Sequence, residues 1–215
     1  MSDPYNPFEA SLQLTRHALE LIDAYQCGAA IATKSDLIVR DGDILDSIAR
    51  HSPVICKLTI TTTDDAMAAR LEPGAPSPTR RLAAHRELAD RGLFAGVLLM
   101  PVLPFLEDTE VNVLEVVERA AEAGASFVYP ALGVTMREGQ REYFLQGLED
   151  AFPGQGLRAR YLRRYGDRYW CASPRARRLW EVFSHRCGQL GMRYRMEQIV
   201  SAATRDYGDR QLSFF

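Results

Sequence analysis

The sequence predicts an α/β fold in which a parallel sheet is covered by helices. Three observations favour this fold over an all-α or all-β one. Apolar runs alternate with amphipathic stretches through the first two thirds of the chain. The runs are nearly continuous, as is typical of parallel strands buried on both faces. Each run also ends in polar or Pro/Gly-rich residues. Four such units fit a partial barrel or an open sheet, and are too few to close an eight-stranded barrel.

The four predicted strands are short and rich in apolar or β-branched residues. The second strand has the run Val54-Ile-Cys-Lys-Leu-Thr59 at its centre, and Pro101 stops the third. The strands are expected at 28–33, 53–63, 94–100 and 126–129.

Helices are predicted between and after these strands. The first is amphipathic, because apolar residues from Phe8 through Leu12 and Ala18 to Leu19 and Ile22 recur at three- and four-residue steps. Asp41 is expected near the cap of the second helix, and Ser77 is expected to cap the helix that starts at Pro78. The predicted helices span 8–25, 41–51, 64–71, 78–90, 110–123, 138–151, 156–165, 174–190 and 196–203.

Composition sets limits on the class of protein. The chain has 215 residues, of which 47% are hydrophobic, and a formal net charge of −2, so charge alone favours neither nucleic acid nor a membrane surface. The longest apolar stretch, 94–106, contains Pro101 and Pro104 and is too short to span a bilayer. No secretory signal pattern opens the chain. The sequence therefore predicts a cytoplasmic protein with no membrane partner.

The four cysteines are scattered along the chain. No two of them lie within four residues of each other, so none forms a ligand pair typical of zinc or iron–sulfur sites. They are Cys27, Cys56, Cys171 and Cys187. Reduced thiols, most of them buried, are the expected state.

Polar residues at the strand ends are the candidates for chemistry. Lys34 follows an apolar strand, where its charge needs water, a partner or a ligand. Contact with an anionic or carbonyl ligand and simple extension to the rim are equally favoured for it. Thr59 and Thr61 offer hydroxyls to a ligand, although threonine is also a good strand residue and that interpretation is favoured. Glu72 and Arg81 flank a loop with three prolines, and an ion pair that braces the loop is favoured over a binding role.

The C-terminal third is rich in arginine and aromatic residues. Between residues 158 and 195 there are eleven arginines and only two acidic residues, with six tyrosines and tryptophans interleaved. Such a pattern is compatible with nucleic-acid binding, but a solvated helical face with core aromatics is the favoured interpretation. The candidate nucleic-acid contacts are Arg160, Arg163, Arg164, Arg168, Arg175, Arg177 and Arg178.

The strand ends, taken together, resemble a known family. In order, they are Ser2–Pro7, Thr33-Lys34-Ser35, Lys57–Thr61, Glu72–Pro78 with Arg81, Met100–Pro104 and Tyr129–Gly133. This combination resembles the spore-photoproduct-lyase-like branch of the radical S-adenosylmethionine (SAM) superfamily, over the chain up to about residue 203.

The resemblance implies a partial (β/α)6 barrel and a particular chemistry. A Cys-x3-Cys-x2-Cys loop would hold a [4Fe–4S] cluster, and reductive cleavage of SAM would give a 5′-deoxyadenosyl radical that abstracts hydrogen from the substrate. The electron donor would be of flavodoxin or ferredoxin type. No such loop is present in this sequence. The resemblance therefore implies an N-terminally shortened chain that lacks one or two strands, binds no cluster by itself and is inactive alone.

The resemblance also assigns residues to SAM binding, but no catalytic residue and no metal ligand. Ser2, Asp3 and Tyr5 would contact SAM, and Lys34 would meet its carboxylate or ribose. The strand ends at Thr59, Thr61, Met100 and Pro101 would face SAM, the last two beside the adenine. The hydrogen-donor cysteine of the lyase would fall before Met1, so the resemblance does not establish a DNA photoproduct as substrate.

Residues 1–136 are predicted to form the partial radical SAM barrel, and 137–215 a helical Arg/Tyr-rich extension. The predicted function is a radical SAM enzyme with an unassigned substrate, DNA or RNA being one candidate. A non-catalytic nucleic-acid- or partner-binding remnant is the alternative, followed by an ordinary α/β enzyme that uses the same strand ends without a metal. An unpaired edge at the strand from Gly28, and hence self-association, is also expected.

Overall fold

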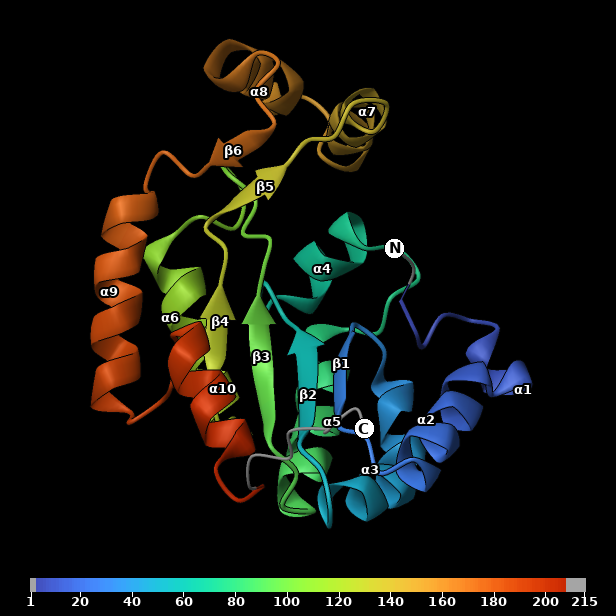
Figure 1. The fold of residues 1–215 in the computed structure, drawn as a ribbon. Coiled ribbons are helices and arrows are strands. Elements are labelled where there is room, and N and C mark those ends of the chain that lie inside the picture. The colour runs from blue at the N-terminus through green and yellow to red at the C-terminus, as the bar shows by residue number, and fades with distance from the viewer. Residues whose placement is uncertain (1–2, 208–215) are drawn as a thin grey trace, which may run out of the picture.

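The computed structural model describes residues 3–207. At its centre lies a parallel sheet in the order β1-β2-β3-β4 (Figure 1). Its strands are β1 (Ala29–Thr33), β2 (Val54–Thr59), β3 (Ala95–Leu99) and β4 (Val128–Pro130). Each strand pairs with the next along the chain, as expected when helices connect parallel neighbours. The predicted fold class, a parallel sheet flanked by helices, is therefore confirmed.

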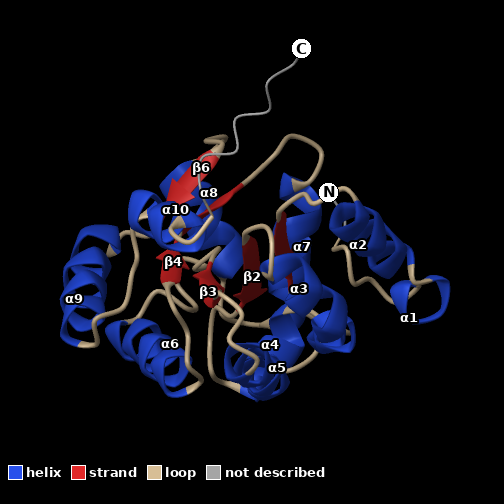
Figure 2. Ribbon diagram, turned by 60° about the horizontal axis from the view of Figure 1, so that its bottom comes forward, coloured by secondary structure: helices blue, strands red, loops and turns tan. Residues whose placement is uncertain are grey.

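Helices cover both faces of this sheet. Helices α5 and α6 lie against one face, and α10 lies on the opposite side (Figure 2). Asp64, Ser77 and Thr109 cap α4, α5 and α6 with their side chains, which explains why these three helices start where they do. The helices up to this point are α1 (Glu9–Leu12), α2 (Leu14–Ala24), α3 (Gly42–Ala49), α4 (Asp65–Leu71), α5 (Pro78–Asp90) and α6 (Glu110–Glu122), with a 3-10 turn η1 (Asp36–Asp41) before α3.

The first predicted helix is interrupted, and its apolar face is largely exposed. Gln13 has a left-handed conformation (φ 51°) between α1 and α2. The Glu9 carboxylate accepts a hydrogen bond from the amide nitrogen of Thr15 at 2.9 Å. It thus satisfies a donor in the first turn of α2 from outside that helix. Phe8 is 71% exposed and Leu12 53%, and Ala18 is exposed too. Of the predicted face, only Leu19 is fully buried.

The second predicted helix starts earlier than expected, with η1. Asp41 makes no side-chain cap and is completely buried. Its carboxylate accepts hydrogen bonds from Tyr5 Oη at 3.1 Å and Arg40 Nη2 at 2.8 Å. A buried carboxylate requires hydrogen-bond donors or a cation beside it, and Tyr5 and Arg40 supply them. Asp41 therefore acts as an ion-pair partner and not as the predicted helix cap.

The C-terminal third is mainly helical, as predicted, but it also contains a small sheet. Strands β5 (Gly133–Thr135) and β6 (Trp170–Ala172) pair antiparallel, and no strand was predicted in either place. They lie on opposite sides of the predicted boundary at residue 136, so this sheet links the two predicted parts. The helices are α7 (Arg141–Ala151), α8 (Leu157–Tyr165), α9 (Ala176–Gln189) and α10 (Met196–Thr204).

Residues 133–172, here called the upper subdomain, lie above the carboxyl ends of the parallel strands (Figure 1). The Tyr161 hydroxyl donates a hydrogen bond to the Pro104 carbonyl at 2.9 Å. The Ser173 hydroxyl, just after this segment, donates to Asp108 Oδ2 at 2.6 Å. Helix α9 instead returns to pack along α6. The end of the sheet where polar residues collect is thus covered by the C-terminal part of the same chain.

Strand β1 forms one edge of the described sheet, since it pairs only with β2 there. Its residues alternate between buried and exposed, with Ala30 and Ala32 exposed. Among residues 3–207, none of the helices combines the length and the apolar character that crossing a membrane requires.

Candidate functional site

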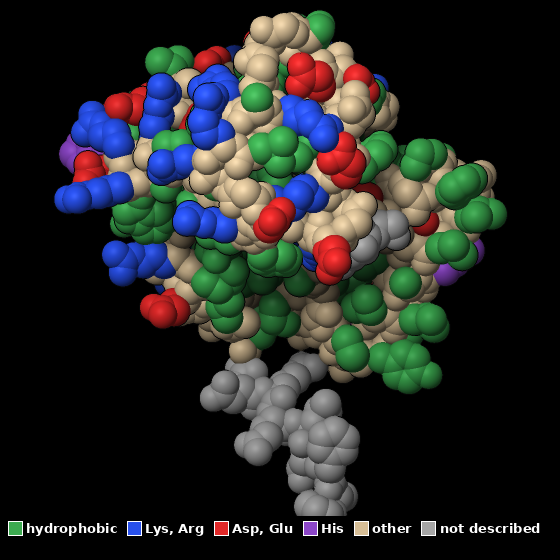
Figure 3. All heavy atoms as spheres, turned by 90° about the horizontal axis from the view of Figure 1, so that it is seen from above, with side chains coloured by type: hydrophobic (Ala, Val, Ile, Leu, Met, Phe, Trp, Pro, Cys, Tyr) green, Lys and Arg blue, Asp and Glu red, His purple; other side chains and the backbone are tan. Residues whose placement is uncertain are grey.

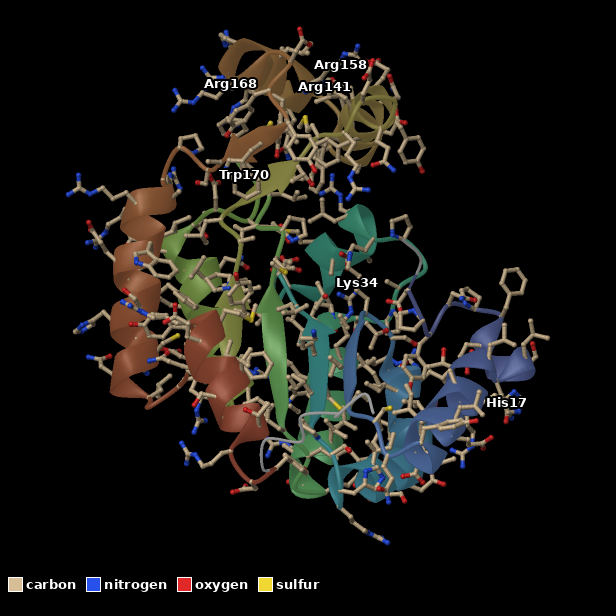
Figure 4. The ribbon with its side chains drawn as sticks, in the orientation of Figure 1. His17, Lys34, Arg141, Arg158, Arg168 and Trp170 are labelled. Carbon is tan, nitrogen blue, oxygen red and sulfur yellow. The ribbon has the colours of Figure 1, made fainter. Side chains whose placement is uncertain are left out.

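The carboxyl ends of the four parallel strands meet at one edge of the sheet, beneath the upper subdomain. In parallel α/β folds this edge is where ligands bind, because the loops after the strands converge there. Lys34 lies at this edge, below α4 and the upper subdomain (Figure 4). Its position makes the edge the candidate functional site.

Asp3 fastens the N-terminal segment to the end of β1. Its Oδ1 accepts a hydrogen bond from Thr33 Oγ1 at 2.6 Å, and its Oδ2 accepts one from the amide nitrogen of Lys34 at 2.8 Å. Asp3 Oδ1 also accepts from the amide of Tyr5 at 2.9 Å. The carboxylate therefore holds the backbone of Lys34 in place at the strand end.

Glu72 lies between two cations. Its Oε2 accepts a hydrogen bond from Arg81 Nη2 at 2.6 Å, and its Oε1 pairs with Lys34 Nζ. Burial alone would raise the pKa of Glu72, but Lys34 and Arg81 together hold that pKa below its usual value. The brace between Glu72 and Arg81 predicted for the proline-rich loop is present, and it extends to Lys34.

Arg81 is the buried anchor of this arrangement, with only 2% of its surface exposed. Its Nη1 donates to the Thr59 carbonyl at 2.9 Å and its Nε to the Pro76 carbonyl at 2.8 Å. One guanidinium thus joins the end of β2, the proline-rich loop and Glu72. A planar group with several fixed donors is suited to such a junction.

The end of β2 is connected to the segment after β3 through a residue that the sequence analysis missed. Thr61 Oγ1 donates to Glu107 Oε1 at 2.6 Å, and the Leu103 amide donates to Glu107 Oε2 at 2.9 Å. Burial raises the pKa of Glu107 to about 7, against the lowering effect of these two hydrogen bonds. The sequence feature that could have identified Glu107 is its position just beyond a strand end, in the loop after Pro101 and Pro104.

Several of the predicted SAM contacts lie together at this edge. The Asp3 carboxylate accepts a hydrogen bond from the Lys34 amide. Arg81 connects the Thr59 carbonyl to Glu72, the ion-pair partner of Lys34, while Thr61 is hydrogen-bonded to Glu107. Met100 and Pro101, joined by a cis peptide bond, end β3 next to β2 and are half-buried.

One predicted SAM contact, Tyr5, is placed differently. The Tyr5 side chain is buried in the core and directs its hydroxyl to Asp41. Desolvation there, together with the charge of Asp41, raises the pKa of Tyr5. Ser2 lies outside the described residues.

A cavity of about 380 Å³ opens beside Lys34. The N-terminal segment contributes Asp3 and Asn6, the turn after β1 contributes Lys34 and Ser35, and the proline-rich loop contributes Pro76. Its size falls within the range of small-molecule sites. Lys34 therefore offers a cation to a ligand-sized space, with Glu72 as its ion-pair partner.

The described cysteines do not fit a three-thiolate cluster. Cys56, Cys171 and Cys187 are each buried in a different hydrophobic core, and Cys27 is exposed. Burial raises the pKa of Cys56 and of Cys187 to about 12, which disfavours the thiolate form that binds a metal. Within residues 3–207 no three His, Cys, Asp or Glu side chains come together as a metal site would require.

The predicted nucleic-acid contacts divide into two groups. Arg178 pairs with Glu110 at 3.0 Å, Arg177 with Glu181 at 3.3 Å, and Arg160 lies over the Phe105 ring at 4.3 Å. Arg175 donates to the Asp108 carbonyl at 3.3 Å. The other three, Arg163, Arg164 and Arg168, are exposed and make no ion pair with any described residue.

Figure 3 shows the face seen from above, with Lys and Arg side chains gathered on one side of it and apolar side chains between them. Tyr169 and Trp170 are about half exposed beside Arg168, whereas Tyr161 and Tyr165 are buried in the core. The aromatics of this region thus split between core and surface.

No family model matches the chain, but several known proteins are similar to it in sequence. An uncharacterized protein of Mycobacterium tuberculosis is 30% identical over 165 residues, 77% of this chain and 48% of the relative. One of Methanocaldococcus jannaschii is 34% identical over 110 residues, 51% of this chain and 41% of the relative. The chain spans about half the length of the curated relatives it matches.

Solved structures of spore photoproduct lyase, a radical SAM enzyme, have the same fold. The complex with dinucleoside spore photoproduct matches with a TM-score of 0.60 at 20% identity, covering 85% of this chain and 54% of that chain. A double mutant with bound AdoMet and dinucleoside spore photoproduct matches with a TM-score of 0.59, also at 20% identity and with the same coverage. The likeness shows that this chain shares the fold of about half of that lyase, with a parallel sheet flanked by helices.

Proposed function

We propose that this chain forms the SAM-binding part of a radical SAM enzyme, and that SAM binds at the carboxyl edge of its sheet. The observation that carries the proposal is the grouping of Asp3, Lys34 and the β2 and β3 ends at this edge of a radical SAM fold. In such enzymes, SAM supplies the group that abstracts hydrogen from the substrate. The substrate of this chain is left unassigned by this proposal.

The charges at the site match the amino-acid end of SAM. The Lys34 side chain is 38% exposed and lines the cavity, and the carboxylate of Glu72 pairs with it. A ligand with an α-carboxylate and an α-ammonium would exchange the Lys34–Glu72 pair for two charge-assisted pairs of its own. Thr59, Met100 and Pro101 would then line the side of the ligand that faces β2 and β3.

The proposal for the whole enzyme includes a [4Fe–4S] cluster and a reductant of flavodoxin or ferredoxin type. Neither is supplied by the described residues. Iron and sulfide content, together with the intact mass of the protein isolated from its own cells, tests this part. A cluster-containing protein with a three-cysteine loop supports it, and iron-free protein of 24.2 kDa contradicts it.

SAM binding is tested by isothermal titration calorimetry. Lys34→Ala should weaken binding by tenfold or more, since a charge-assisted hydrogen bond contributes about 1.5–3 kcal/mol. Arg50→Ala is the matched control, because it removes one exposed positive charge from the end of α3, outside the site. Absence of SAM binding to the wild type at millimolar concentration, or equal affinity for wild type and Lys34→Ala, contradicts the proposal.

A second candidate function is the binding of single-stranded nucleic acid by a non-catalytic chain. Arg163, Arg164 and Arg168, with half-exposed Tyr169 and Trp170 beside them, favour it. Figure 4 shows Arg168 and Trp170 on the upper subdomain, away from Lys34. Phosphates would meet the arginines, and bases would stack on the rings.

The salt dependence of affinity tests this candidate. Three phosphate contacts predict a slope of about −2 for log K against log salt. Replacing all three arginines with alanine should abolish the slope, and Arg177→Ala, which removes an arginine already paired with Glu181, should leave it unchanged. Salt-independent binding, or no binding at low salt, excludes this function.

A further inference from the structure

A second cavity, of about 460 Å³, lies between α4 and the upper subdomain. Its walls are mainly apolar and come from several elements: Leu71 from α4, Leu103 from the loop after β3, and Met136, Phe144 and Leu148 from the upper subdomain. Sites for small molecules are of this size and character. The cavity adjoins the strand-end site, because Leu71 directly precedes Glu72 and the Leu103 amide donates to Glu107.

The lining holds one charged residue, Arg70, and no acidic one. Arg70 Nε donates to the Ala151 carbonyl at 2.9 Å, and the guanidinium lies 4.1 Å from the centre of the Phe152 ring. A cationic ligand group would lose its hydration here without gaining a partner. Gln140, Thr135 and Tyr143 at the exposed rim offer neutral hydrogen-bonding groups.

Gly147 lines the cavity from the middle of α7. Glycine inside a helix is destabilising relative to alanine, so its presence needs a reason. Its φ is not positive, and a Cβ added there meets no atom within 4 Å. Neither backbone conformation nor close packing therefore requires glycine. One turn later, Ala151 lines the same cavity, so two small residues on one helix face keep the space open.

We propose that this cavity binds an aromatic ring that carries no positive charge and has a peripheral hydrogen-bonding group. Phe144 and Tyr143 provide ring contacts, and the Met136 sulfur is a favourable neighbour for an aromatic ring. The absence of an acidic residue from the lining selects against cationic groups. The assignment of this ring to the enzyme's substrate rests on the proposed function. The binding of the ring to the cavity does not rest on it.

The test uses N-phenyl-1-naphthylamine, an uncharged aromatic dye whose fluorescence rises in apolar surroundings. Gly147→Phe should fill the cavity and weaken dye binding at least tenfold, equivalent to about 1.4 kcal/mol. Gly188→Phe is the matched control: Gly188 lies inside α9, outside the cavity, and an added Cβ there also meets nothing within 4 Å. Its dye affinity should equal that of the wild type.

Thermal unfolding checks that the variants fold, and Gly147→Leu serves if Gly147→Phe does not. Equal dye affinity in the wild type and the filled variant, or no saturable binding by wild type, overturns the inference. SAM titration into Gly147→Phe separates the two proposals. If wild type binds the neutral dye but not SAM, the proposed function fails and the cavity site stands; if it binds SAM but not the dye, the cavity site fails alone.

Discussion

Arg81 donates a hydrogen bond to Glu72 at 2.6 Å from a position beneath the strand ends where only 2% of its surface is exposed. The preceding residue, Arg80, pairs with Asp36 at 2.6 Å, but on the surface, with its side chain 67% exposed. Two adjacent arginines of α5 thus form ion pairs of equal length in opposite surroundings. Their contributions to stability should differ accordingly.

Arg81→Met should lower the free energy of unfolding by about 3–5 kcal/mol. It leaves the carboxylate of Glu72 half-buried and removes the donors to the Thr59 and Pro76 carbonyls. Arg80→Ala should cost less than about 1 kcal/mol, since exposed pairs are screened by water. Urea unfolding measures both, and similar losses in the two variants would show that burial does not set the strength of these pairs.

Glu107 should make the protein less stable as the pH rises from about 4.5 to about 7. Its pKa is raised to about 7 in the folded protein, so the folded state binds more protons than the unfolded chain across this range. This stabilisation is fully present below the pKa that Glu107 has in the unfolded chain, and it is lost above the pKa that Glu107 has in the folded protein. A shift of this size corresponds to a change on the order of 3 kcal/mol.

Glu107→Gln, which cannot titrate, is the comparison for this effect. As the pH rises from about 4.5 to about 7, the unfolding free energy of the wild type should fall relative to that of Glu107→Gln. A difference that stays constant with pH would mean that Glu107 is ionised throughout.

His85 should have the opposite pH dependence in its own range. It is completely buried; its Nδ1 lies 3.1 Å from the Ala123 carbonyl, and its Nε2 has no hydrogen-bond partner among residues 3–207. Burial lowers its pKa below the ordinary 6.5. The unfolded chain therefore binds the proton more readily, and stability falls as the pH drops below about 6.5.

His85→Asn keeps a donor for the Ala123 carbonyl and removes the titration. Urea midpoints at pH 7.5 and 5.5 should differ less in this variant than in wild type. His185→Asn, at an exposed position on α9, should keep the wild-type pH response. An unchanged response in His85→Asn would contradict the assignment.

Gly96 in β3 should not tolerate alanine. An added Cβ would lie 2.5 Å from atoms of the Phe127 ring, which is 1% exposed and has little room to move. Gly96→Ala should cost about 1–3 kcal/mol through overpacking. Adding Phe127→Leu should recover part of the loss, so a double-mutant cycle in urea measures the coupling; strictly additive effects would show that the ring moves aside freely.

The sequence predicted most elements of the fold because their signals are local. The β-branched run of β2 and the cap at Ser77 need no distant partner. The break at Gln13 was missed because it depends on Glu9, whose carboxylate is held by Arg40 at 2.7 Å, thirty-one residues away in the chain. Strands β5 and β6 were missed because each has three residues and pairs across two helices.

The candidate site was predictable only in part, for the same reason. Positions at strand ends can be read from a sequence, so Lys34 and Thr61 were candidates. Their partners are set by packing between distant segments: Glu107 lies 46 residues from Thr61. The covering of the strand ends by the upper subdomain, and the cavity beneath it, have no local signal at all.

The separation of the three buried cysteines has a practical consequence for following the opening of this molecule. Each thiol is shielded in its own core, so a thiol-labelling reagent can reach it only when that core opens. Labelling rates read separately at Cys56, Cys171 and Cys187 would report on the β1–β2 region, the upper subdomain and the α6–α9 packing. The native chain thus carries three internal reporters of local unfolding, and needs no engineered label to show whether its parts open together or one at a time.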